Sequence, residues 1–157
     1  MTNDNDKTLL IFNLKRFIKT CEKSKYQTTI NGLKRKDING TFRSFKIKPT
    51  FGSGNLVKRP ALAFLKDDNE VSKGIYPIIV YIPNKNELIT CKGVSFDNKS
   101  SKNWSRINEK DIPLIQTTYN DEKGQLSYFR NSYKLDELNE QTIEEIILDI
   151  EDIIKDY

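Results

Sequence analysis

The segment FGSGNLVKRPALAF, residues 51–64, contains the residue types of a phosphate-binding loop, because two glycines precede the basic pair Lys58 and Arg59. In a phosphate loop of the Walker type, four residues separate the first glycine from a Gly-Lys-Ser/Thr sequence that opens a helix. No such ending follows Gly52, and Pro60 with the apolar residues after it predicts a strand, not a helix whose N-terminus would bind phosphate. No third glycine completes a dinucleotide-binding fingerprint either. The segment therefore predicts a turn or the rim of a binding site.

Other catalytic constellations lack their residues. The chain has no histidine, which removes Ser-His and Cys-His nucleophile pairs and histidine metal sites. Its two cysteines, Cys21 and Cys91, are too few for a four-ligand zinc site and are predicted to be reduced packing residues. A nuclease would need grouped carboxylates to hold magnesium, whereas Glu87 and Lys92 stand five residues apart and the acids of residues 67–70 belong to a turn. We expect a binding protein and not an enzyme, with no catalytic residue, metal or cofactor.

Charge is distributed unevenly along the chain. Residues 15–60 contain thirteen lysines and arginines against two acids, whereas residues 135–157 contain nine acids against one lysine. The basic half, interleaved with aromatic residues, predicts an anionic partner, and nucleic acid is the commonest candidate because basic side chains contact phosphates and aromatic rings stack on bases. The acidic half is expected to be a solvated helix face. The basic residues in or beside loops are Lys34, Arg35, Lys36, Arg43, Lys46, Lys48, Lys58 and Arg59, and the aromatics for which core packing is favoured are Phe42, Phe45 and Trp104.

The spacing of apolar residues predicts a helix at each end of the chain. One helix covers residues 7–23, and the other follows Thr142, which with Glu145 resembles a capping box. Between them, short β-branched runs bounded by Gly, Pro, Asn and Asp predict strands, and IPNKNEL predicts a hairpin turn. Pro77 indicates an edge position or a bulge, since proline cannot donate to a ladder.

The part between the strands and the last helix is expected to be less regular. Asp111 is predicted to cap a short helix that ends near Tyr119, and residues 120–133 are predicted to be a loop. Together these elements predict a single α+β domain over residues 1–157, with a curved, mostly antiparallel sheet of about four to six strands packed with the two amphipathic helices. The chain has no membrane-spanning apolar run and no signal peptide, so a soluble, cytoplasmic protein is expected.

Several segments together resemble a known family. TFRSFKIKPTFGSGN, PALAFL, SKGIYPIIVY and GVSFDN occur in this order and are followed by Trp104. Their order and spacing over residues 41–104 resemble the N-terminal DNA-binding domain of the McrB subunit of modification-dependent restriction enzymes, and similarity continues through residues 111–113 and SYFRNSY. The resemblance implies a mixed α/β domain that binds double-stranded DNA, flips a modified cytosine and holds it in a pocket. It also implies a GTP-hydrolysing motor domain in the same polypeptide and a separate nuclease subunit.

The resemblance also implies site residues. The four pocket positions map to Ser53, Ala61, Tyr76 and Val80, of which the first two are aromatic in the best-known members of the family. Tyr76 therefore becomes the aromatic of the set and is expected to stack on a flipped, 5-substituted cytosine. The expected DNA contacts are Asn55, Lys58 and Arg59 at the rim, with Lys34, Arg35, Lys36 and Arg43.

The small residues at two pocket positions leave alternatives open. The pocket could be wider and accept a bulkier base, such as a hydroxymethylated or glycosylated cytosine, with the Ser53 hydroxyl bonding a polar substituent. Trp104 or Phe96 could fill the gap, or the protein could read unmodified DNA through the groove at a specific site. Outside DNA binding, the acidic last helix could dock a protein partner. A self-contained nuclease is the least favoured interpretation.

Overall fold

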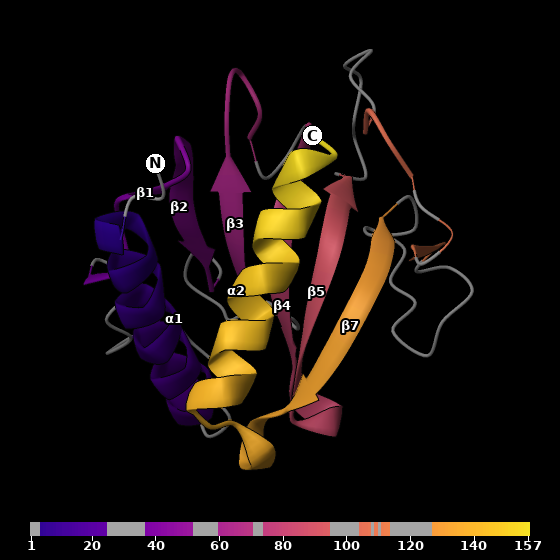
Figure 1. Cartoon of the computed structure of the whole chain (residues 1–157). Helices are drawn as coiled ribbons and strands as arrows, with labels where there is room; N and C mark the ends of the chain where they lie inside the picture. Colours follow the sequence, from indigo (N-terminus) through magenta and orange to yellow (C-terminus); the bar gives the residue numbers. More distant parts are fainter. Residues whose placement is uncertain are drawn as a thin grey trace.

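The computed structural model describes residues 4–24, 37–51, 60–70, 74–94, 104–107, 109, 111–113 and 127–157. In this part of the chain, seven strands form one antiparallel sheet in the order β1-β2-β3-β4-β5-β7-β6 (Figure 1). Two of them, β1 (Thr41–Phe42) and β6 (Ile112–Pro113), have two residues each. The longer strands are β2 (Phe45–Thr50), β3 (Ala61–Leu65), β4 (Ile75–Ile82), β5 (Glu87–Val94) and β7 (Tyr128–Lys134). The predicted α+β class, with its antiparallel sheet and terminal helices, is confirmed.

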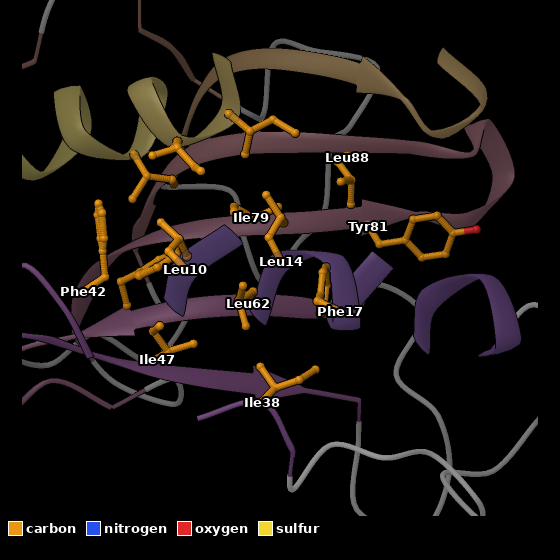
Figure 2. Close-up of a cluster of buried hydrophobic side chains, with 14 of the residues drawn as sticks. Leu10, Leu14, Phe17, Ile38, Phe42, Ile47, Leu62, Ile79, Tyr81 and Leu88 are labelled. Carbon is orange, nitrogen blue, oxygen red and sulfur yellow. The ribbon is translucent and has the colours of Figure 1, made fainter. Parts of the chain in front are cut away.

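Both helices lie on the same face of the sheet, which we call the helix face. α1 (Asp4–Ser24) lies over β1 and its neighbours, and α2 (Glu140–Lys155) crosses β4, β5 and β7 (Figure 1). Leu10, Leu14 and Phe17 of α1 point into a core that also contains Leu62, Ile79, Tyr81 and Leu88 from alternate positions of three strands (Figure 2). This alternation follows from the strand period of two, and burial of the helix side chains is the main stabilising term.

The last helix begins three residues before the predicted start. Asn139 is the N-cap, and its side-chain oxygen accepts a hydrogen bond from the Thr142 backbone N–H at 2.9 Å. The prediction of Thr142 as the cap is therefore wrong, because Thr142 lies in the first turn and its own amide is the one that Asn139 caps. A stripe of buried isoleucines then packs α2 onto the sheet, as its spacing predicted: Ile143, Ile146, Ile147, Ile150 and Ile153.

The β4–β5 hairpin is confirmed, but the position of Pro77 differs from the prediction. The turn consists of a short 3-10 segment, Pro83–Lys85, followed by Asn86 in the left-handed conformation with φ 51°. β4 is an internal strand between β3 and β5, not an edge. Its pairing with β3 ends at Ile78, however, so Pro77 is paired only with Lys92 on β5. The missing N–H of Pro77 therefore removes no hydrogen bond between β3 and β4. The sheet's register shift lies elsewhere, between β5 and β7 at Thr90/Cys91.

Two predictions for the region before α2 are wrong where the structure describes it, and residues 114–126 lie outside the described part. Residues 112–113 form β6 instead of opening a helix, and residues 128–134 form β7 instead of a loop. The Asp111 carboxylate is buried against Lys92 and Arg130, and the residues that it was predicted to cap lie outside the described part of the chain. The described helices include none long and apolar enough to cross a membrane.

Candidate nucleic-acid interface

The sheet face opposite the helices carries a second set of apolar side chains, and we call it the far face. Strand alternation directs Tyr76, Ile78, Val80 and Ile82 of β4 to this side, away from Ile79 and Tyr81. Ile82, Ile89 and Cys91 form a buried cluster there, flanked by Ile78, Val80 and Phe129, and neither described helix contributes a residue to it.

Three of the four predicted pocket positions come together on the far face. Ala61 is the direct cross-strand partner of Val80, and Tyr76 lies four residues before Val80 on the same strand and the same side. Ala63, paired with Ile78, is another small side chain of this face. Ser53 lies outside the described residues. The sheet register thus places Tyr76 on the same face as Ile78 and Val80, and as the alanines opposite them on β3.

The Tyr76 ring lies against the backbone of β5. Its cross-strand partner is Gly93, and a methyl group added at Gly93 would come within 3.0 Å of Tyr76 Cε2. Tyr76 is 5% exposed, and burial raises the pKa of its phenol to about 12. The ring is therefore neutral at physiological pH, and neutral aromatic rings suit stacking on a base.

Two described lysines border this surface. Lys46 and Lys48 are exposed and alternate with Phe45 and Ile47, which face the helices, so the lysines project on the far-face side of β2. The register pairs Lys48 with Ala63 and Lys46 with Leu65. A basic strand thus lies beside the strand that carries Ala61.

Arg43, a predicted DNA contact, forms contacts within the protein with α1, α2 and Phe42. It lies in the β1–β2 turn with φ 51°, and its guanidinium pairs with Glu151 of α2 at 2.8 Å and covers the Phe42 ring at 4.7 Å. Its backbone N–H donates to Asp6 of α1 at 2.9 Å. The structure therefore places Arg43 on the helix side and does not bring it to Tyr76. The other predicted DNA contacts lie outside the described residues: Lys34, Arg35, Lys36, Asn55, Lys58 and Arg59.

The aromatic residues for which core packing was favoured are core residues. Phe42, Phe45 and Trp104 are buried in the helix-face core, at 0%, 2% and 6% exposure. Trp104 packs edge-on against Tyr157 with ring centroids 5.9 Å apart. Because this contact lies on the helix face, the suggestion that Trp104 fills the pocket gap is wrong. Phe96 lies outside the described residues.

A buried charge cluster joins β5 to the region before β7 and the end of α2. The Lys92 ammonium, fully buried, donates to Asp111 at 2.6 Å and to Asp156 at 2.9 Å, and Arg130 donates two hydrogen bonds to the other Asp111 oxygen. Desolvation lowers the pKa of Arg130, but hydrogen bonds and charge from Asp111 and Asp152 outweigh it and raise the pKa overall. Every carboxylate of the cluster has a cationic partner, so the arrangement is structural. No group of acids or cysteines in the described residues could hold a metal ion.

The acidic surface of α2 is exposed, as predicted, and is partly ion-paired. Ion pairs connect Glu144 to Lys7, Glu140 to Lys15 and Glu151 to Arg43. A hollow of about 330 Å³ remains between α2 and β7, and its lining includes Glu145, Leu148 and Asp149. The two carboxylates there would repel a phosphate backbone, so the far face is the better candidate surface for DNA.

The comparisons with known proteins agree with the motifs. No protein-family model matches the chain. The chain is 33% identical over 152 residues to the EcoKMcrB subunit of the type IV methyl-directed restriction enzyme of Escherichia coli strain K12. The chain is similar to McrB. The match covers 92% of the chain but 31% of the McrB subunit, so the chain spans about a third of that relative's length. The resemblance to McrB that the motifs predicted is thereby confirmed.

Proposed function

We propose that residues 1–157 form a DNA-binding specificity module that directs a modification-dependent restriction system to its target. The module binds double-stranded DNA, flips a 5-substituted cytosine and stacks it on Tyr76. The observation that carries this proposal is the shared location of Tyr76, Ala61 and Val80 on the sheet face away from the helices. The similarity to a methyl-directed restriction subunit supports a modified base as the target.

The energetics of base flipping favour this face. Extruding a base costs a few kcal/mol of unstacking and unpairing, and a stacking contact with one aromatic ring returns about 1 to 3 kcal/mol. Apolar neighbours such as Ile78 and Val80 would bury the apolar surface of the base and would not compete for its hydrogen bonds. Because Tyr76 is 5% exposed, a base that reaches the ring must first displace whatever covers it.

The small pocket residues favour a substituent bulkier than methyl. Ala61 stands where the resemblance leads one to expect a ring, and its register partner Val80 is also compact. The pocket would then have room near Ala61 and Val80 for a hydroxymethyl or glycosyl group, with the Ser53 hydroxyl as a hydrogen-bonding partner. Asn55, Lys58 and Arg59 would contact the DNA around the flipped base, and Lys34, Arg35 and Lys36 would add phosphate contacts.

In this proposal the chain itself does no chemistry. If the system resembles that of the McrB relative, GTP hydrolysis and DNA cleavage belong to a motor domain and a nuclease subunit elsewhere in the assembly. The part of the chain that the structure describes offers no grouped carboxylates for a magnesium-dependent nuclease, which favours a binding role.

The deciding experiment measures affinity for matched duplexes. Four duplexes of one sequence carry cytosine, 5-methylcytosine, 5-hydroxymethylcytosine or its glucosylated form at one position, and fluorescence anisotropy gives each Kd. We expect the chain to bind one modified duplex about tenfold or more tighter than the plain duplex, and Tyr76→Ala to remove that preference.

A matched control separates loss of the ring from loss of the fold. Tyr76→Phe keeps the ring and should keep the preference, whereas thermal unfolding of each variant shows that the protein is folded at the assay temperature. Equal affinity of Tyr76→Ala and parent for the modified duplex would contradict stacking on Tyr76. Binding to none of the four duplexes would contradict DNA recognition altogether.

A further inference from the structure

Gly93 is the point where the candidate base site meets the backbone of β5. It stands in the regular ladder opposite Tyr76, where a residue with a side chain would ordinarily be preferred, since glycine weakens a strand. A Cβ at this position would lie 2.8 Å from the Tyr76 carbonyl oxygen, 3.0 Å from Tyr76 Cε2 and 3.1 Å from Ile78 Cγ2. The first distance is shorter than real Cβ contacts, so the backbone or the ring would have to shift. Only a glycine leaves the ring in its present place.

The same peptide is held from the opposite side of the sheet. The indole N–H of Trp104 donates a hydrogen bond to the Gly93 carbonyl oxygen at 3.1 Å, and this bond is buried. Trp104 is in turn packed edge-on against Tyr157, next to the end of α2, and the chain terminus lies beside the end of β5 (Figure 1). The preceding residue, Lys92, is fixed by Asp111 and Asp156.

These two contacts act on one peptide unit from two faces of the sheet. The far face receives the Tyr76 ring, and the helix face supplies the donor that fixes the carbonyl. A buried hydrogen bond contributes to stability and also restricts the orientation of the group that accepts it. The position of the ring therefore depends on Gly93 and, through Gly93, on Trp104.

We propose that Gly93 and Trp104 are positioning residues of the candidate base site: Gly93 sets how closely the Tyr76 ring approaches β5, and Trp104 holds the Gly93 peptide from the helix face. This inference rests on the proposed function for its consequence in DNA binding, but its structural part concerns the ring of Tyr76 alone. Neither residue touches the base. Their role is to keep the stacking surface at one depth and orientation, which a site that distinguishes substituents on a base requires.

The test uses two variants and one control. Gly93→Ala adds the Cβ that meets Tyr76, and Trp104→Phe removes the indole donor while retaining an aromatic ring against Tyr157. Ile79→Val, a mild truncation in the helix-face core on β4, reports the effect of lost stability without contact to Gly93. The two substitutions are independent, so the test survives if one of the variants does not fold.

Two readouts separate positioning from stability. The first is the fluorine NMR spectrum of 3-fluorotyrosine-labelled protein, in which the Tyr76 resonance is assigned by its absence in Tyr76→Phe. The second is the ratio of the Kd values for plain and modified duplexes, which a smaller folded fraction leaves unchanged because it weakens both equally. We expect Gly93→Ala and Trp104→Phe to shift the Tyr76 resonance and to lower the ratio by about tenfold, the loss of one stacking contact. Ile79→Val should change neither.

An unchanged Tyr76 resonance and an unchanged ratio in the folded variants would overturn the positioning role. If the parent protein binds plain and modified duplexes equally, the proposed function fails, and the resonance alone then decides the inference. A shift in that case supports positioning of Tyr76 by Gly93 and Trp104 for a different ligand, and no shift overturns it.

Discussion

At the scale of single residues, part of the candidate site follows from chain spacing and part does not. Tyr76 and Val80 lie four positions apart on a strand, so the period of two already requires them to share a face. The pairing of Ala61 with Val80 depends on the register between two strands, which is set by the whole sheet. Gly93 carried a signal that the sequence interpretation missed: a glycine inside a strand indicates close approach of another group.

Burial of Tyr76 has a consequence at high pH. The pKa of its phenol is raised from 10.0 to about 12 in the folded chain by desolvation. Between these values the unfolded chain loses the proton while the folded chain keeps it, so the free energy of unfolding falls as the pH rises from 10 to 12. Tyr76→Phe removes this group, and its stability should fall less steeply, by about 1.4 kcal/mol per pH unit. Urea unfolding at pH 9, 10 and 11 measures the slopes. Parallel slopes for parent and variant would show that Tyr76 ionises equally in both states.

At the scale of elements, the strongly periodic segments were predictable and the region before β7 was not. The isoleucine stripe of α2 and the hairpin between β4 and β5 depend on local spacing and turn chemistry, and both predictions held. Asp111 was predicted to be a helix cap because an Asp before an apolar run is the usual pattern of one. Its real partners, Lys92 and Arg130, are each 19 residues away in the chain, and no local pattern indicates them. Pro77 was misplaced for a similar reason, since the point at which the pairing between β3 and β4 ends decides whether its missing donor matters.

The Lys92 cluster connects β5, β7 and α2, and removing one of its charges should strongly destabilise the fold. Asp111→Asn keeps the shape of the side chain but leaves the buried ammonium and guanidinium short of one countercharge. We expect the free energy of unfolding to fall by about 3 to 5 kcal/mol, the usual loss when one partner of a buried pair is removed. Urea denaturation of the parent and the variant measures it.

An exposed ion pair provides the comparison for that measurement. Lys15 and Glu140 join α1 to α2 at 3.0 Å, and their side chains are 48% and 83% exposed. Lys15→Ala should therefore cost at most about 1 kcal/mol, because solvent screens the pair. A loss for Asp111→Asn as small as that for Lys15→Ala would mean that water or rearranged side chains replace the missing charge.

At the scale of the whole molecule, the two sheet faces differ in charge, and the two described helices cover one of them. The helix face carries α2, whose acids pair with Lys7, Lys15 and Arg43, so part of the basic charge that the sequence attributed to a nucleic-acid surface is engaged in ion pairs with α2. The far face has apolar side chains bordered by Lys46 and Lys48. Composition alone could predict a basic half but could not divide its charges between internal ion pairs and a free surface, since that division depends on which strand edges and helices meet.

This polarity predicts which lysines DNA binding depends on. If the duplex lies across the far face, Lys46→Ala and Lys48→Ala should each weaken binding to all duplexes alike, because phosphate contacts carry no sequence information. Each should also reduce the slope of log K against log salt by about one unit, since one fewer counterion is released. Lys19→Ala, an exposed lysine of α1 on the helix side, is the matched control and should leave the slope unchanged. Anisotropy titrations from about 50 to about 200 mM salt measure the slope, because binding that depends on phosphate contacts weakens strongly over this range. A slope that falls for Lys19→Ala but not for Lys46→Ala or Lys48→Ala would place the DNA on the helix face, and Tyr76 could not then receive a flipped base from it.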